Sequence, residues 1–242
     1  MTTTIPTGRL GNQIIRNLAV SLIAKKHNLK VKYCNKELIQ SLGLELYSGN
    51  REYEKTHPLT DDNFFSVYYL NDINYNLKSG DNFFQTKEIT NFLYEYLHSN
   101  EVKKNIINKN PFMNRYNNNN DLYIHIRLTD VKQYNPGINY YLKAIQMIEF
   151  DNLFISTDEP EHDIIKQLYE SYPLLKIIDY DEIKTFQFAS TNKHIILSHG
   201  SFSAIIGYLS FFSNIYYPEY EDGKIWYGDM FSIKDWKKIN IF

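Results

Sequence analysis

The sequence predicts an α/β fold built from two Rossmann-like lobes, the second of which holds a doubly wound parallel sheet. In the second half of the chain, short apolar runs alternate with helical patterns, which is typical of parallel strands covered on both faces. The first half has the same strand–helix opening, with a short β-like stretch before residue 8 and then the first helix. A polar run of asparagines at 117–120 separates the halves and suits a linker. We therefore expect one lobe over residues 1–116 and another over 121–242, and we allow the C-terminal segment to pack back on the first lobe.

The elements of the first lobe are unevenly marked. Apolar residues recur at helical spacing from Asn12 to His27, and Val31–Tyr33 follows as a short strand. Between residues 36 and 108 the pattern is weaker. It favours strands at Phe64–Leu70 and Asn82–Gln85 and a helix at Lys87–Leu97.

The second lobe is marked more clearly. A turn at Pro136-Gly137 precedes a helix at Tyr141–Ile148, Pro160 lies near the start of a helix that runs to about Tyr172, and an apolar helix begins near Ser203. Strands are expected at Leu122–Ile126, Leu153–Ser156, Leu175–Ile178, His194–Leu197 and Ile215–Tyr217.

Bulk properties exclude several classes of protein. The 242 residues carry a net charge of −2 without a basic stripe, which argues against a nucleic-acid partner. Cys34 is the only cysteine, so no disulfide can form within the chain. We find no signal-peptide pattern, no apolar run near the roughly 20 residues of a transmembrane helix, and no cysteine, histidine and carboxylate cluster for a metal. The sequence thus predicts a soluble cytoplasmic protein without a metal site, and it leaves the oligomeric state open.

Three segments follow predicted strands and precede helices, where ligands bind in open parallel sheets. The first, residues 8–13, reads G-R-L-G-N-Q. Its glycines let the backbone approach a ligand, and the helix N-terminus after it favours negative charge. A helix-starting turn capped by an asparagine is an equally good interpretation.

The second segment, residues 125–130, reads H-I-R-L-T-D and ends the strand Leu122–Ile126. Alternation along the strand puts His125 and Arg127 on one face. A guanidinium at this place can bind two phosphate oxygens, and Asp130 could orient it or act as a base. The alternative is a buried structural pair of arginine and aspartate.

The third segment, residues 198–203, reads S-H-G-S-F-S and precedes the apolar helix. Small hydroxyl residues and a glycine at a helix N-terminus can hold a phosphate, although an ordinary strand–helix turn has the same composition. Asp158 follows the strand Leu153–Ser156 at the same edge, where it could contact a ribose or base, or cap the next helix.

Taken together and in this order, the three segments resemble the α-1,2-fucosyltransferase family and its α-1,6- and protein O-fucosyltransferase relatives. That family shares a G-G-L-G-N-Q opening and an H-x-R-R-x-D motif, which match residues 8–13 and 125–130. Its segment N-S-T-F-S-W-W-A-A-Y-L is similar to residues 199–209, and its terminal tryptophan pattern is similar to Trp226 and Asp235-Trp236. The resemblance spans nearly the whole chain.

The resemblance implies a GT-B architecture, with two lobes facing a cleft, the nucleotide sugar in the C-terminal lobe and a glycan acceptor largely on the N-terminal lobe. It implies GDP-fucose as co-substrate, transfer with inversion, and no cofactor or metal. Arg127 matches the arginine that contacts the donor diphosphate, and we give it a catalytic role together with Asp130. The residues assigned to donor binding are Gly11, Asn12, His125, Asp158, Ser201, Phe202 and Ser203.

Two positions depart from the family pattern. Leu128 stands where the motif has its second arginine, and Thr185 falls near an acidic position, unless Asp181 or Glu182 serves instead. A transferase for another nucleotide sugar and a nucleotide-sugar-binding pseudoenzyme therefore stay as alternatives. A glycoside hydrolase is disfavoured, because no pair of carboxylates flanking a cleft can be identified.

Overall fold

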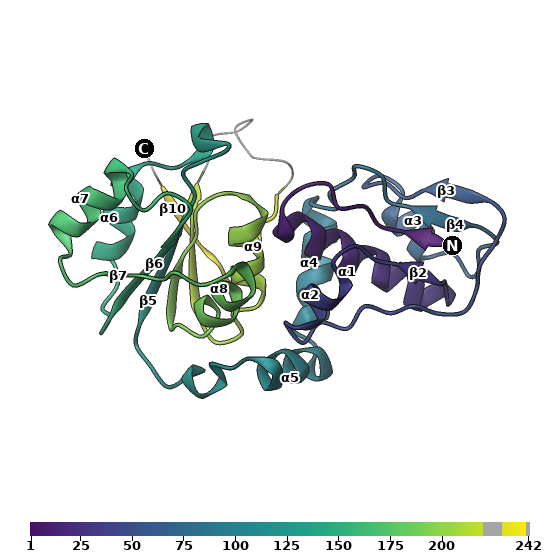
Figure 1. The fold of residues 1–242 in the computed structure, drawn as a ribbon, viewed down its shortest axis with the longest axis horizontal. Helices are drawn as coiled ribbons and strands as arrows, with labels where there is room; N and C mark the ends of the chain where they lie inside the picture. The colour runs from purple at the N-terminus through teal and green to yellow at the C-terminus, as the bar shows by residue number, and fades with distance from the viewer. Residues whose placement is uncertain (220–228, 241–242) are drawn as a thin grey trace. The chain divides into compact units, whose positions relative to one another are not determined.

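The computed structural model describes residues 1–219 and 229–240 and divides the chain into two α/β units (Figure 1). The first unit comprises residues 1–109 together with Asp229 and Met230, and the second comprises the other described residues. The division falls after Lys109, whereas the sequence favoured the asparagine run. The residues just after Lys109 bond to the second unit: Asn110 donates to the carbonyl of Gln187 at 2.8 Å.

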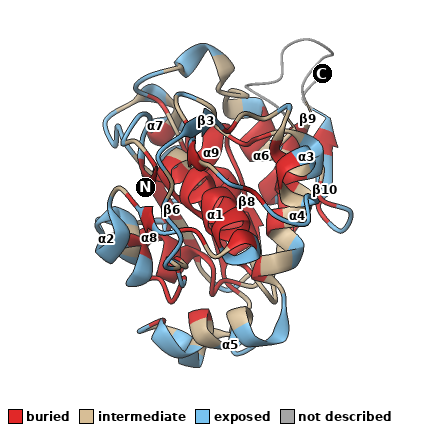
Figure 2. Ribbon diagram, turned by 90° about the vertical axis from the view of Figure 1, so that its right-hand side faces the viewer, coloured by how far each residue is buried: buried red, intermediate tan, exposed pale blue. Residues whose placement is uncertain are grey.

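The first unit holds a parallel four-stranded sheet of order β2-β1-β4-β3. Helix α1 runs through its core and is buried along most of its length (Figure 2). The strands are β1 (Thr2–Thr3), β2 (Val31–Lys32), β3 (Thr56–Pro58) and β4 (Asn76–Lys78), and the helices are α1 (Leu10–His27), α2 (Lys36–Gln40), α3 (Phe64–Tyr68), α4 (Lys87–Leu97) and α5 (Asn100–Lys109).

Helix α4 confirms the prediction, and it begins where the Thr86 side chain accepts a hydrogen bond from the Ile89 amide. The two weak strand predictions are wrong. Residues 64–68 form helix α3, because Phe64 and Val67, three apart, bury the same helical face. Residues 82–85 form a loop in which Phe84 takes a positive φ of 55°, a conformation that no strand allows.

The second unit holds a parallel six-stranded sheet of order β10-β9-β8-β5-β6-β7. All five predicted strands are present, and α8 and β10 are additional. The strands are β5 (Leu122–Ile126), β6 (Leu153–Thr157), β7 (Lys176–Ile177), β8 (His194–Ile196), β9 (Asn214–Glu219) and β10 (Lys237–Asn240), and the α-helices are α6 (Ile138–Gln146), α7 (Asp163–Ser171), α8 (Glu182–Ala189) and α9 (Gly200–Tyr208).

The order of strands places a topological switch point between β5 and β8. From β5 the chain moves outward to β6 and β7, then returns to β8 on the other side of β5. Ligands of doubly wound sheets bind where the carboxyl ends of two such strands diverge. Ile124 pairs with Ile196, so Arg127 and His199 each stand three residues beyond a paired position, at this same edge.

Burial follows from this layering. Strand β5 is buried along its whole length, since it is central in the sheet, and α9 is buried at nearly every position. Among the described residues, no helix is both long enough and apolar enough to cross a bilayer.

Candidate functional site

Arg127 leaves β5 at the switch point and is oriented by Asp130. Its Nε and Nη2 donate to Oδ1 of Asp130 at 3.1 and 2.6 Å. The arginine side chain is only 11% exposed, whereas Asp130 is 47% exposed. The remaining nitrogen, Nη1, lies toward Gly200, since a Cβ added there would be 4.0 Å from it. Asp130 thus fixes the direction of the guanidinium and leaves one edge of it facing helix α9.

Helix α9 starts opposite that edge. His199 is its N-cap residue and makes no capping bond with its side chain, and Gly200 takes a φ of +84°, which favours glycine. The first backbone N–H groups of a helix lack intrahelical partners and attract anions. The guanidinium and these amides together make a place for a phosphate or another anion.

His125, two residues before Arg127 on β5, is part of a stack of three rings. Its ring stacks on Phe202 with centroids 4.9 Å apart, and Phe202 stacks on Phe186 at 4.1 Å. Its Nδ1 contacts Oγ of Ser203 at 2.6 Å, and the amide of Ser198 donates to the same oxygen at 3.1 Å. The hydroxyl of Ser203 is therefore already bonded within the protein, and the ring of Phe202 is stacked against both His125 and Phe186. Ser201, two residues before Ser203 in α9, is buried as well.

Both histidines of the site are neutral. Burial, reinforced by the Arg127 charge, lowers the pKa of His125 from 6.5 to about 3. The same two causes lower the pKa of His199 to about 4. His199 is fully buried, and its Nδ1 lies 3.2 Å from Oγ of Ser198. Its Nε2 has no hydrogen-bond partner in the part of the chain that the structure describes. The positive charge beside these rings comes from the guanidinium.

Asp158 supports the segment after β5. Its Oδ1 accepts from the amide of Leu128 at 2.7 Å and its Oδ2 from the hydroxyl of Thr129 at 2.5 Å. Burial acts to raise the pKa of Asp158, but these hydrogen bonds outweigh it, so the pKa is lowered. Leu128 itself is 2% exposed and belongs to the apolar core.

Gly11 and Asn12 belong to the first unit, at the start of α1. Asn12 is not the cap of the helix, which is Arg9; its Oδ1 accepts from Nε2 of Gln85 at 2.7 Å instead. That contact links the first turn of α1, which follows β1, to the loop after β4, and β1 and β4 are neighbouring strands. The segment 8–13 thus lies at the carboxyl edge of its own sheet.

The same loop is fastened by two further side chains of α1. Nε2 of Gln13 donates to the carbonyls of Pro6 and Gly8, and Nη1 of the fully buried Arg16 donates to those of Ile5 and Thr7. Side chains one turn into the helix therefore hold the approach to it. Sequence reasoning missed this role, because it requires knowing which carbonyls the loop leaves unpaired.

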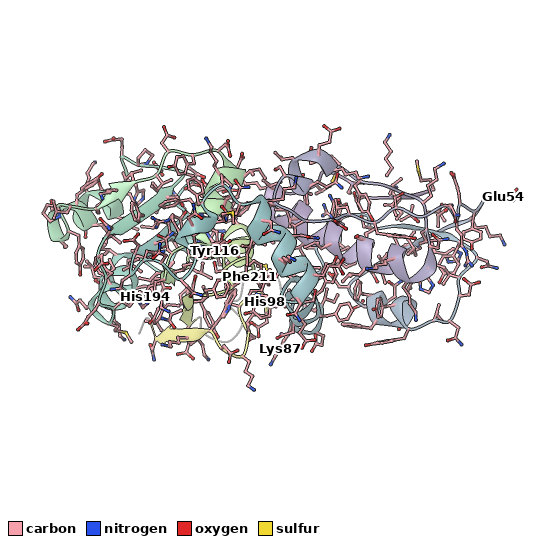
Figure 3. All side chains as sticks on the ribbon, turned by 90° about the horizontal axis from the view of Figure 1, so that it is seen from below. Glu54, Lys87, His98, Tyr116, His194 and Phe211 are labelled. Atoms are coloured by element: carbon pink, nitrogen blue, oxygen red, sulfur yellow. The ribbon has the colours of Figure 1, made fainter. Side chains whose placement is uncertain are left out.

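Several other candidates have defined places. Thr185 is buried in α8 and donates to the carbonyl of Tyr180, while Asp181 caps that helix by accepting from the Lys184 amide. His194, labelled in Figure 3, lies at the amino end of β8, the end opposite to His199. Trp226 lies outside the described residues.

Sequence reasoning also missed the groups behind His199. Tyr141 donates to Oγ of Ser198 at 3.0 Å, and Asn135 donates to Oη of Tyr141 at 3.2 Å. The only signal was that Tyr141 starts an amphipathic helix, which indicates burial without indicating a partner. Across residues 1–219 and 229–240, no three histidine, cysteine or carboxylate side chains are grouped as metal ligands.

Comparisons with known proteins define the fold. No protein-family model matches the sequence, and no curated protein matches it significantly. A structure of a mutant of FUT1 from Arabidopsis thaliana in complex with GDP is similar over 93% of this chain and 71% of that one, with a TM-score of 0.52 and 13% identity. E. coli heptosyltransferase WaaC with ADP-2-deoxy-2-fluoro heptose is similar over 98% of this chain and 92% of that one, with a TM-score of 0.51 and 9% identity. The chain therefore has the GT-B fold of glycosyltransferases.

Proposed function

We propose that this protein is a glycosyltransferase that binds a nucleotide sugar at the switch point of its second unit. The observation that carries the proposal is the placement of Arg127, whose guanidinium is aligned by Asp130 and faces the N-terminus of α9. A diphosphate needs such a pairing of a fixed cation with free backbone amides. The carboxyl edge of a doubly wound sheet at its switch point is where nucleotides bind in this class of fold.

The donor that we propose is GDP-fucose. The order of the three sequence segments supports it, as does the GDP complex of FUT1 among the similar structures. Transfer from a different nucleotide sugar is the second candidate, because WaaC, which is equally similar in fold, was solved with an ADP-heptose analogue. Leu128 lacks the charge of the second motif arginine, so this position does not favour one donor over the other.

The proposed reaction is a single displacement with inversion. A hydroxyl oxygen of the glycan acceptor forms a bond to the anomeric carbon and releases its proton to water, while the bond from that carbon to the phosphate oxygen breaks. The electron pair goes to the leaving nucleoside diphosphate, whose growing negative charge is stabilised by Arg127 and by the amides of residues 201–203. These groups supply the positive potential, so the proposal requires no metal. We further propose that the enzyme acts in the cytoplasm and has no nucleic-acid partner.

A panel of donors tests the proposal. The protein is titrated with GDP, ADP and UDP by calorimetry, and GDP-fucose and other nucleotide sugars are then assayed for hydrolysis or transfer. We expect binding of a nucleoside diphosphate and turnover of the matching sugar. Binding without turnover would favour the pseudoenzyme, and failure to bind any diphosphate would refute the proposal.

Arg127→Ala identifies the site. Removing a preorganised donor to the leaving group costs about 10²–10³ in rate, so this variant should lose nearly all transfer while it keeps the fold. Arg51→Ala is the matched control, because Arg51 is an exposed arginine of the first unit paired with Asp72 at 2.6 Å. If Arg127→Ala kept most of the wild-type rate, the site would lie elsewhere.

A further inference from the structure

The imidazole of His199 ends a hydrogen-bonded chain that starts at α6. Asn135 donates to Oη of Tyr141, Tyr141 donates to Oγ of Ser198, and Ser198 lies 3.2 Å from Nδ1 of His199. Since Ser198 already accepts the proton of Tyr141, we assign its own hydroxyl proton to the contact with Nδ1. The neutral ring therefore carries its proton on Nε2.

Within residues 1–219 and 229–240, that Nε2–H donor has no hydrogen-bond acceptor, although His199 is 0% exposed. The backbone of Val131 is close enough to the ring to act as a hydrogen-bond acceptor that raises the pKa of His199, but the contact does not reach hydrogen-bonding geometry. Leaving a buried donor unpaired costs free energy, and native proteins rarely do so without a reason. A ligand oxygen that completes the bond is such a reason.

The surroundings of the ring identify the ligand chemistry. His199 is the N-cap of α9, and its charged neighbours are Arg127, Asp130 and Asp158. Both carboxylates are already hydrogen-bonded, Asp130 to Arg127 and Asp158 to the segment after β5. A helix N-terminus and a guanidinium both favour an anion. An acceptor that enters here and meets Nε2 is therefore an oxygen of an anionic group.

We propose that Nε2–H of His199 binds a phosphate oxygen of the nucleoside diphosphate. This inference rests on the proposed function and adds a residue to that site: a neutral donor beside Arg127, in a sequence that has Leu128 where its resembled family has a second cation. Its role is to position the diphosphate through a hydrogen bond that adds no charge.

Access to Nε2 requires the segment after β5 to move. Val131 lies against the ring with a φ of +55°, a conformation that β-branched residues rarely adopt, and the Tyr134 ring centroid is 6.4 Å from that of His199. We expect diphosphate binding to shift this segment, because Nε2 is otherwise covered.

Two matched variants test the inference by calorimetric titration with GDP, ADP and UDP. In His199→Gln the amide nitrogen reaches the place of Nε2, whereas in His199→Asn it reaches only the place of Nδ1. We expect His199→Asn to weaken diphosphate binding by about 10- to 100-fold and His199→Gln to weaken it by less than about 5-fold. The reverse order would show that contact with Ser198 is what counts, and would overturn the inference.

A spectroscopic readout separates ligand contact from a structural role. With ¹⁵N-labelled histidine, saturation with the diphosphate should shift the Nε2 signal of His199 and slow exchange of its proton; an unchanged signal would overturn the inference. GDP and GDP-fucose should respond alike, and a loss confined to the sugar nucleotide would refute the phosphate contact.

If Arg127→Ala abolishes binding while both His199 variants bind normally, only this inference fails. If neither Arg127→Ala nor the His199 variants alter binding, the proposed function fails with it.

Discussion

The neutrality of His125 and His199 predicts a specific loss of stability in acid. Folding lowers the pKa of these side chains from 6.5 to about 3 and about 4, chiefly through burial. Below pH 6.5 these two histidines therefore bind protons in the unfolded chain but stay neutral in the folded protein. The free energy of unfolding therefore has its full value above pH 6.5, and it decreases as the pH falls toward the folded pKa values.

The magnitude follows from linkage. At about pH 5, both histidines are neutral in the folded protein and mostly protonated in the unfolded chain. Each then lowers the free energy of unfolding by about 2 kcal/mol relative to about pH 7.5. Two independent sites give about 4 kcal/mol, a large part of the stability of an ordinary domain.

The assay is chemical unfolding followed by circular dichroism across this pH range, for wild type, His125→Asn, His199→Asn and the double variant. Asparagine does not titrate, so each single variant should lose about 2 kcal/mol less than wild type between the two pH values. Burial also lowers the pKa of His194, so the comparison between variants, rather than the wild-type curve, carries the test. Equal pH dependence in all four proteins would mean that the histidines titrate as in the unfolded chain, and our description of the site's charge would be wrong.

Two further substitutions test the local geometry by thermal or chemical unfolding. Gly8→Ala and Gly137→Ala impose similar strain at φ values of +82° and +83°, but a Cβ at Gly8 would also lie 2.6 Å from Nδ2 of Asn12, while Gly137 has open space. Gly8→Ala should be the more destabilising by about 1 kcal/mol or more, and equal losses would contradict the packing at Asn12. Leu128→Arg, which restores the family's charge, should destabilise the protein by about 3–5 kcal/mol, with Leu128→Met losing less than about 1.5 kcal/mol; a stable arginine variant with tighter diphosphate binding would refute the core placement.

The second unit could be predicted well because its strands are central and fully buried. Leu122–Ile126 shows only apolar or large aromatic residues and one histidine, and it is buried at every position. Such runs bounded by turn residues are the clearest signal that a parallel sheet leaves in a sequence. The edge strand β10 escaped prediction because three of its four residues are exposed and lack that signal.

The first unit was harder to predict for the opposite reason. Its strands have two or three residues each, too few for a period of alternation to be seen. The aromatic run at 64–70 has high strand propensity, yet Phe64 packs against Phe84 and Phe92, and tertiary packing of this kind decides for a helix. Local composition cannot reveal those partners.

The candidate site shows the same division between pattern and partner. Strand position was enough to place Arg127 at the sheet edge, and its sequence neighbour Asp130 was correctly expected within reach. The sequence could not show that the hydroxyl of Ser203 contacts His125. Nor could it show that Nε2 of His199 has no hydrogen-bond partner among the described residues. Those facts depend on side chains brought together across β5, β8 and α9, which no single segment encodes.

This arrangement explains why position 128 holds a leucine where the family motif has an arginine. Alternation beyond β5 turns Arg127 toward α9 and sends Leu128 into the core, among residues such as Ile126 and Tyr141. A second guanidinium at 128 would have to be buried in that apolar cluster, where its desolvation is costly. The positive potential for a diphosphate must then come from Arg127 and the amides of α9, and any further contact must come from a neutral donor. His199 is our candidate for that donor once the segment after β5 moves, because it lies at the same edge of the sheet and its Nε2 lacks a partner among the described residues.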